Sequence, residues 1–333
     1  MFVLHSYALA VIFCFISMLC WGSWANTQKM TGKNWRFELF YWDYVFGVFL
    51  LAAAGALTVG MTGTEGRSFF GDISQASSRN IGSAMLGGLI FNAGNISLVA
   101  AIDIAGMAVA FPIGVGLSLA LGVVLNYVAT PVGNAPILFS GVGLIMAAII
   151  LDAVAYRRVP GQVRAVTTKG LVLSLAVGFL LAFSYRFTAG SMATNLTEPE
   201  AGTLGPYSAL FFMSLGVLGS NFIFNTIIMK KPFVGEPVHL SRYFEGRGRD
   251  HLLGLFGGVI WSFGMLTNLV ASGQAGFPIS YGLGQGATMV AALWGVFIWK
   301  EFKGAPGGTD RLLTLMFLGY VAGLVLIIVA RVV

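Results

Sequence analysis

Long apolar segments alternate with short polar loops along the whole chain. Each segment holds about 20 residues, the length of helix that crosses a hydrocarbon core of about 30 Å. The pattern predicts ten spans, at residues 7–26, 39–60, 80–102, 105–129, 134–156, 169–192, 204–229, 252–271, 275–299 and 311–331. No loop is long enough for a separate soluble domain. The expected fold is therefore an all-α polytopic membrane protein with ten transmembrane helices.

The composition agrees with a bilayer as the main partner. Of 333 residues, 57% are hydrophobic and 10% are charged, whereas soluble domains carry about 25% charged residues. Lys and Arg outnumber Asp and Glu by 19 to 13, but the basic residues stand between apolar segments. We interpret them as topology signals and expect no nucleic-acid partner.

The sequence offers no set of residues for catalysis. His5, His239 and His251 lie at span edges or in loops, and no pair has the spacing of metal ligands. Neither a G-x-S-x-G sequence nor a nucleotide-binding P-loop is present. We therefore expect neither an enzyme nor an ATP-driven pump, and no metal or cofactor.

Basic residues divide unevenly between the loops. The odd-numbered loops hold Lys29, Lys33, Arg36, Arg157, Arg158, Arg164, Lys169, Lys230, Lys231, Arg242, Arg247, Arg249, Lys300, Lys303 and Arg311. The even-numbered loops and the termini hold only Arg67, Arg79 and Arg331. The positive-inside rule then predicts cytoplasmic odd loops and both termini outside, in a cell inner membrane.

Two sequence patterns occur twice. G-G-L-I-F-N-A-G at 87–94 returns as G-G-V-I-W-S-F-G at 257–264, and F-P-I-G-V-G at 111–116 returns as F-P-I-S-Y-G at 277–282. The offsets are 170 and 166 residues, and a four-residue difference fits one helical turn between spans 3 and 4. The alternative is chance similarity between Gly-rich apolar segments.

A duplication makes each half a set of five spans, and the odd number turns the second half upside down in the membrane. We predict a first repeat at 1–156, a cytoplasmic linker at 157–168 and a second repeat at 169–333. The duplicated Phe-Pro-Ile motifs place Pro112 and Pro278 at equivalent points. Interrupted helices at such points indicate a binding site in transporters, although a packing kink is the simpler alternative.

Neutral polar side chains inside the spans suggest what the site binds. The candidates for substrate binding are Trp21, Asn92, Asn95, Pro112, Asn126, Tyr127, Trp261, Pro278, Tyr281 and Gln285. Amides and hydroxyls suit a neutral polar solute, and indole rings stack on sugars or heterocycles. Each amide could instead join helices, and each Trp could anchor the interface.

Three charged residues are candidates for proton coupling: Glu38, Asp43 and Arg186. Asp43 lies about one and a half turns into its span, where a carboxyl could carry a proton. Glu38 is close enough to the interface to be a boundary charge. Arg186 lies among apolar residues and is expected to pair with a carboxylate or with the solute.

W-G-S-W at 21–24, G-N-I-S at 94–97 and L-N-Y at 125–127 resemble the ureide permeases. The two Phe-Pro-Ile motifs resemble the glucose-uptake proteins and, more distantly, the rhamnose–proton symporters. All belong to the glucose/ribose porter branch of the drug/metabolite transporter superfamily.

The resemblance implies two inverted five-helix repeats and proton-coupled uptake of a sugar, ureide or similar solute. It assigns motif positions to Trp21, Gly22, Gly94, Asn95, Pro112, Asn126, Tyr127 and Pro278. Plant ureide permeases have a longer central loop with a nucleotide-binding-like motif. The segment between Arg157 and Lys169 is short and lacks one, so regulation by nucleotide is not implied.

The prediction is a secondary active transporter that imports a small neutral polar solute, a sugar or a ureide- or nucleobase-like compound, by proton symport. The alternative is a metabolite or drug exporter of the same superfamily. An exporter of lipophilic cations requires an unpaired carboxylate in the cavity, and the sequence places none at mid-membrane. The sequence does not determine the oligomeric state, and a homodimer is one of the alternatives.

Overall fold

A computed structural model describes residues 1–32, 34–160 and 167–333 of the chain. Within these residues, ten helices are long and apolar enough to cross a membrane, which confirms the predicted number. Two of the basic residues counted above, Lys33 and Arg164, lie outside the described residues, as does part of the predicted linker at 157–168. The side chains of Asp103, Met107 and Ala108 are also outside them.

The first five spans follow the predicted order. They are α1 (Tyr7–Ser23) with the short α2 (Asn26–Lys29), α3 (Phe37–Leu57), α5 (Ser78–Ala105), α6 (Met107–Ala110) with the π-helix η1 (Phe111–Val115) and α7 (Gly116–Ala129), and α8 (Ala135–Arg157). A short helix, α4 (Phe69–Gln75), lies in the loop between α3 and α5.

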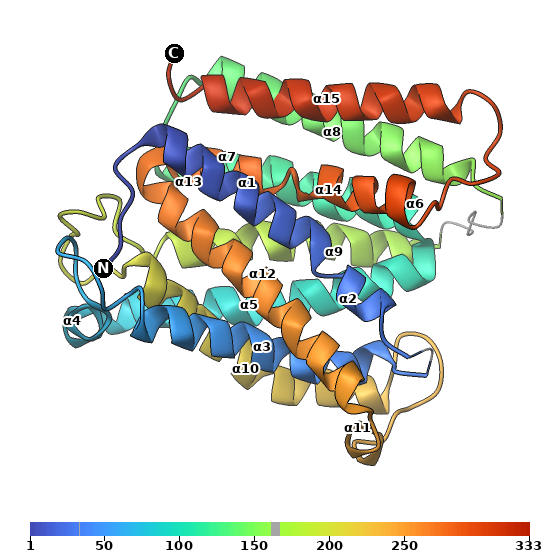
Figure 1. The fold of residues 1–333 in the computed structure, drawn as a ribbon, viewed down its shortest axis with the longest axis horizontal. Coiled ribbons are helices and arrows are strands. Elements are labelled where there is room, and N and C mark those ends of the chain that lie inside the picture. The colour runs from blue at the N-terminus through green and yellow to red at the C-terminus, as the bar shows by residue number, and fades with distance from the viewer. Residues whose placement is uncertain (33, 161–166) are drawn as a thin grey trace.

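The second five spans complete the bundle. They are α9 (Thr168–Ala189), α10 (Pro206–Lys230), α12 (Gly248–Ala275), α13 (Phe277–Gly284) with α14 (Ala287–Leu293) and the π-helix η2 (Trp294–Ile298), and α15 (Thr309–Val329). The short α11 (Ser241–Phe244) precedes α12. In Figure 1, α8 and α15 form a pair along one side of the bundle, and α3 and α10 lie on the other.

The two longest helices end in the same way. Both α5 and α12 have 28 residues and stop at a glycine with positive φ, Gly106 at 78° and Gly276 at 80°. Only glycine adopts this conformation at no steric cost, and it reverses the chain. After Gly276 the Phe-Pro-Ile motif follows at once, whereas α6 separates Gly106 from Phe111. The four extra residues therefore lie where span 3 meets span 4.

Glycines bring two pairs of helices into backbone contact. A Cβ at Gly88 of α5 would lie 1.9 Å from the Met213 carbonyl oxygen of α10, and a Cβ at Gly258 of α12 would lie 1.9 Å from that of Tyr44 in α3. The opposing glycines are Gly216 and Gly47. Neither crossing has room for a side chain at these points, so each helix pair can pack this closely only with glycine there.

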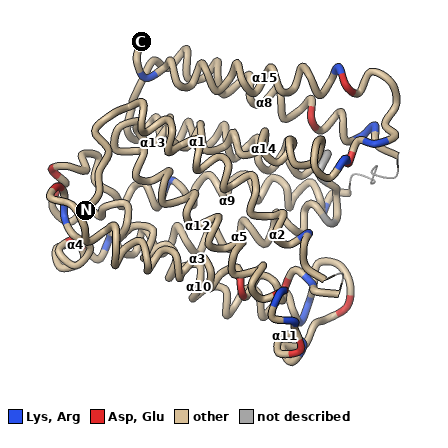
Figure 2. The backbone as a smooth tube through the Cα atoms, viewed as in Figure 1, with Lys and Arg blue, Asp and Glu red and all other residues tan. Residues whose placement is uncertain are grey.

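Charge separates the two ends of the bundle. Figure 2 shows most Lys and Arg residues gathered at one end of the bundle, which carries the described loop residues 30–32, 34–36, 231–247 and 299–308 and the end of α8. We call this the basic end. The opposite, or far, end carries both chain termini and the loops 58–77 and 190–205.

Candidate functional site

A cavity of about 390 Å³ lies inside the bundle and reaches the basic end. Its wall is largely aromatic, with rings from Trp21, Trp24, Phe91, Phe111, Tyr156, Tyr185, Trp261, Tyr281, Trp294 and Trp299. Its polar wall groups come from Asn26, Gln28, Lys29, Asn95, Ser184, Gln285, Thr288 and Glu301. Such a mixture of apolar area and few polar groups is typical of a small-molecule site.

Three aromatic rings in contact form one wall of the cavity. Trp21 of α1 and Trp261 of α12 stack with centroids 6.4 Å apart and planes 18° apart, and the Phe91 ring lies 4.2 Å from Trp261. Two glycines make room for Trp21, because a Cβ at Gly264 or Gly284 would lie 2.9 or 2.7 Å from the indole ring. The rings offer flat faces to a planar or ring-shaped solute.

Asn95 is held by a buried chain of hydrogen bonds. Its Nδ2 donates to the Tyr41 hydroxyl at 3.1 Å, Tyr41 donates to Asn92 Oδ1 at 2.9 Å, and Asn92 Nδ2 donates to Ser220 Oγ at 2.9 Å. Because Asn95 uses its Nδ2 as the donor in this chain, its Oδ1 is left as a hydrogen-bond acceptor on the cavity wall. Asn92 is fully buried behind it and does not line the cavity, so it orients Asn95.

Two tyrosines close the inner part of the cavity. The Tyr185 hydroxyl donates to Asn268 Oδ1 at 2.8 Å, and the Tyr281 hydroxyl lies 2.7 Å from Ser118 Oγ. Both hydroxyls are thus occupied by buried partners, and the rings, with centroids 4.5 Å apart, face the cavity. The sequence analysis did not select Tyr185. The signal that could have found it is a tyrosine, a ring with a polar hydroxyl, inside span 6.

The mouth of the cavity at the basic end is charged. Lys29 Nζ lies 2.7 Å from Glu301 Oε1, and the Tyr156 hydroxyl donates to Glu301 Oε2 at 2.5 Å. Beside this pair, Trp299 Nε1 donates to Asn26 Oδ1 at 2.6 Å. We did not predict these residues as a site, because loop residues far apart in sequence carry no signal that they meet.

The ten predicted solute-binding residues divide into two groups. Trp21, Asn95, Trp261, Tyr281 and Gln285 line the cavity. The other five, Asn92, Pro112, Asn126, Tyr127 and Pro278, are not on its wall.

Geometry explains why four of those five lie elsewhere. Asn126 Nδ2 donates to the Gly122 carbonyl in its own helix, and Tyr127 lies near the far end against Phe139. Pro278 occupies the first turn of α13, where the missing N–H frees no helical carbonyl. Pro112 lies in η1, at the start of its span. Pro278 therefore shapes the start of a helix at the far end, whereas Pro112 lies just after α6, where the helix changes from α to π geometry near the basic end.

Asp43 lies apart from the cavity, in a cluster near the basic end. Its Oδ1 accepts from the Tyr243 hydroxyl at 2.5 Å, and its Oδ2 lies 2.9 Å from His251 Nδ1. The ring of Trp35 packs edge-on against His251. Burial and the bond to Asp43 raise the pKa of Tyr243, so its hydroxyl stays a donor. Both carboxylate oxygens of Asp43 are thereby occupied.

The other two predicted coupling residues also lie off the cavity. Glu38 pairs with Arg36 and lines a separate hollow of about 480 Å³, which shares Gln28 with the cavity wall. Arg186 lies in the last turn of α9 and folds over Gly190. Within the described part of the chain it has no carboxylate partner, so the expected ion pair with a carboxylate is not observed, and pairing with the solute stays a prediction. The helix simply ends sooner than the predicted span.

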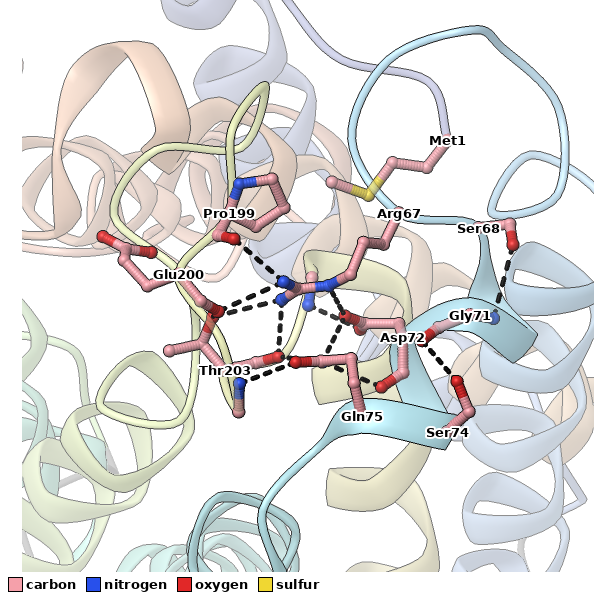
Figure 3. A network of polar contacts seen from close by, with 12 residues as sticks. Met1, Arg67, Ser68, Gly71, Asp72, Ser74, Gln75, Pro199, Glu200 and Thr203 are labelled. Carbon is pink, nitrogen blue, oxygen red and sulfur yellow. Dashed lines mark hydrogen bonds and ion pairs between the residues drawn. The ribbon is translucent and has the colours of Figure 1, made fainter.

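A polar network closes the far end of the bundle (Figure 3). Arg67 donates from Nε to Asp72 Oδ1 at 2.9 Å and from Nη2 to the Thr203 carbonyl at 2.7 Å. Asp72, only 2% exposed, also accepts from the Gly205 amide at 2.7 Å. The network joins α4 to the loop 190–205, which lies between α9 and α10, so it ties the two halves of the chain together.

Comparison with known proteins gives the family. The profile described as ureide permease matches residues 40–165 and 157–330. Ureide permease 1 of Arabidopsis thaliana is 22% identical over 96% of each chain, and ureide permease 5 of the same plant is 22% identical over 94% of this chain and 92% of that one. A solved structure, described only as a crystal structure of a protein, matches 98% of this chain and 100% of its own with a TM-score of 0.63 and 17% identity.

These matches confirm the resemblance to ureide permeases and the expectation that the chain is not an enzyme. Its resemblance to glucose-uptake proteins and rhamnose symporters, and its place in the glucose/ribose porter branch, stay predictions. The chain belongs to the ureide permease family, as a multi-pass membrane permease for small solutes.

Proposed function

We propose that the chain imports a small neutral polar solute, a sugar or a ureide- or nucleobase-like compound, by proton symport. The cavity carries this proposal: stacked indole rings flank an oriented amide acceptor, Asn95. Its charged wall groups, Lys29 and Glu301, pair with each other. A wall of rings and neutral hydrogen-bonding groups favours an uncharged solute over an ion. The names of the Arabidopsis relatives add ureides to the candidates.

Solute binding in this proposal involves the wall residues with free polar groups or ring faces. Asn95 Oδ1 accepts a hydrogen bond from the solute, and Gln285 supplies a second amide to the cavity wall, from the end of α13. Trp21 and Trp261 cover the ring of the solute. Pro112 and Pro278 act indirectly, by setting where spans 4 and 9 begin.

Transport proceeds by rocking of two inverted five-helix repeats, 1–156 and 169–333, joined by the linker 157–168. The matched crossings at Gly88 and Gly258 support this arrangement, since these glycines are 170 positions apart and meet helices of equivalent order. Matched hydrogen bonds from Asn92 to the Val217 carbonyl and from Ser262 to the Val48 carbonyl support it too. The cavity opens at one end while Arg67 closes the other, as alternating access requires.

The basic end faces the cytoplasm in this proposal, and both termini face outward from the inner membrane. The concentration of Lys and Arg at one end supports this orientation (Figure 2). The conformation described is then open to the cytoplasm. A homodimer stays a prediction.

Uptake of labelled glucose, rhamnose, allantoin and uracil into transporter-deficient cells tests the proposal, with and without a protonophore. We expect one of these solutes to accumulate, and we expect the protonophore to abolish the accumulation. If the protein is in the membrane and no solute accumulates, import is wrong, and the exporter of the same superfamily is the function to test by efflux.

A further inference from the structure

Asp152 is a buried carboxylate for which the described part of the chain provides no hydrogen-bond partner. It lies in α8, is 8% exposed, and its Oδ1 has no hydrogen bond within the residues that the structure describes. One turn further along, the Tyr156 hydroxyl lines the cavity mouth and donates to Glu301. We propose that Asp152 is the carboxyl that binds and releases the coupling proton, reached from the cavity past Tyr156 and Glu301. This inference rests on the proposed proton symport.

The chain is shaped to bring Glu301 to this point. Lys300 has a φ of 53°, a left-handed conformation that an L-residue with a side chain adopts at some cost. The turn lets the Glu301 amide donate to the Gly295 carbonyl at 2.9 Å. A Cβ at Gly295 would lie 2.9 Å from both Glu301 Oε2 and the Tyr156 hydroxyl, so glycine leaves space for that bond.

Charges around Asp152 leave one negative charge unbalanced. Glu301 accepts from the Tyr156 hydroxyl, one helical turn from Asp152, and Lys29 is already paired with Glu301. Tyr320 of α15 is fully buried, and its hydroxyl also has no hydrogen bond within the described residues. An ionised carboxylate buried without a partner is costly, and one bound proton removes that cost.

The other elements packed against α8 bring no compensating charge to this point. The segments α6, η1 and α7 contain no charged residue in their sequences. Asp310 and Arg311 are exposed at the start of α15, and Arg158 points toward Gly308. The side chain of Asp103 lies outside the described residues.

The site also joins the two halves of the chain. Tyr156 and Lys29 belong to the first half, whereas Glu301 belongs to the second. When the halves rock, the bond between Tyr156 and Glu301 must change, and with it the access of Asp152 to the cavity. Asp43 lacks this connection, because both its oxygens are held by Tyr243 and His251 away from the cavity wall.

Infrared difference spectra of the purified protein, recorded across a pH titration, test the assignment without any solute. The carbonyl stretch of a protonated carboxyl should be present in the wild type and lost in Asp152→Asn. Asp43→Asn should keep it. Asp152→Glu keeps a carboxyl at this point on a longer side chain, so the band should remain but move in frequency. Equal elution volume and melting temperature show that each variant is folded.

Retention of the band in folded Asp152→Asn, or its loss in Asp43→Asn, would overturn the assignment. If Asp152→Asn does not fold, an unchanged band in folded Asp152→Glu would overturn it instead. Once a solute is known, Asp152→Asn should lose protonophore-sensitive accumulation and keep exchange of labelled for unlabelled solute. Failure to find any solute leaves the infrared result intact, so this assignment and the proposed import fail separately.

Discussion

The two ends of the bundle differ in chemistry: a polar network closes the far end, and a cavity opens at the basic end. At the far end, Arg67 and Asp72 are largely buried, with side chains 20% and 2% exposed, and they bond mostly to backbone groups of the loop 190–205. At the basic end, Lys29 and Glu301 are 47% and 22% exposed and sit at the rim of a cavity. A buried pair that bonds backbone on both sides locks a conformation, whereas a wet pair at a rim can rearrange at little cost.

Breaking the far-end pair should have the largest effect. Arg67→Ala leaves the buried Asp72 carboxylate without its cation, and removing one partner of such a pair costs about 3–5 kcal/mol. Thermal unfolding of the purified protein should show a clearly lower melting temperature, and transport should fall. Arg67→Lys keeps the charge but loses the contacts to Thr203. Its melting temperature should therefore lie between those of the wild type and Arg67→Ala. Wild-type stability in Arg67→Ala would show that the network does not close the far end.

The second-largest loss of stability is expected at the helix crossings between the two ends of the bundle. A Cβ at Gly258 would overlap the Tyr44 carbonyl at 1.9 Å, so Gly258→Ala must separate α12 from α3. Overpacking of this kind costs about 1–3 kcal/mol. Gly219→Ala is the matched control, because a Cβ there meets nothing within 4 Å. If both variants melt at the same temperature, the crossing is not tightly packed.

Cavity residues should affect uptake with little change in stability. Asn95→Ala removes an acceptor from the wall, a loss of about 0.5–1.5 kcal/mol for one hydrogen bond, and should raise KM by up to about tenfold. Asn92→Ala should also raise KM. Asn92 is not on the cavity wall, but its side chain orients Asn95 through Tyr41. An unchanged KM in Asn95→Ala would remove this residue from the proposed site.

The same contrast between ends explains what could be predicted from sequence. Ten spans and the basic end were predictable, because apolar length and loop charge are local properties of the chain. Trp21, Asn95 and Gln285 line one cavity, since costly polar or aromatic groups inside spans face the protein interior; their role in binding stays a prediction. Pro112 and Pro278 lie off the cavity wall, and Pro278, in the first turn of its helix, looks the same in sequence as a proline that breaks a helix.

Pairs that form between distant loops were not predictable. Arg67 meets residues more than 130 positions away, and Lys29 meets a residue 272 positions away. Asp43 and His251 are 208 positions apart. From the sequence, Asp43 was a candidate for proton coupling and His251 a residue at a span edge, and nothing indicated that the two side chains meet. Which loops meet depends on how ten helices pack, and a single sequence holds no local record of that.

The smallest effect is expected at the rim of the cavity. Lys29→Ala removes the ammonium from a pair that is nearly half exposed on the lysine side, and such pairs contribute about 0–1 kcal/mol. The melting temperature should therefore change far less than in Arg67→Ala under the same conditions. Uptake should become less dependent on salt, because a charge at the mouth has been removed. A loss of stability as large as that of Arg67→Ala would mean that both ends are locked, and that the conformation with the open mouth is held as firmly as the closed far end.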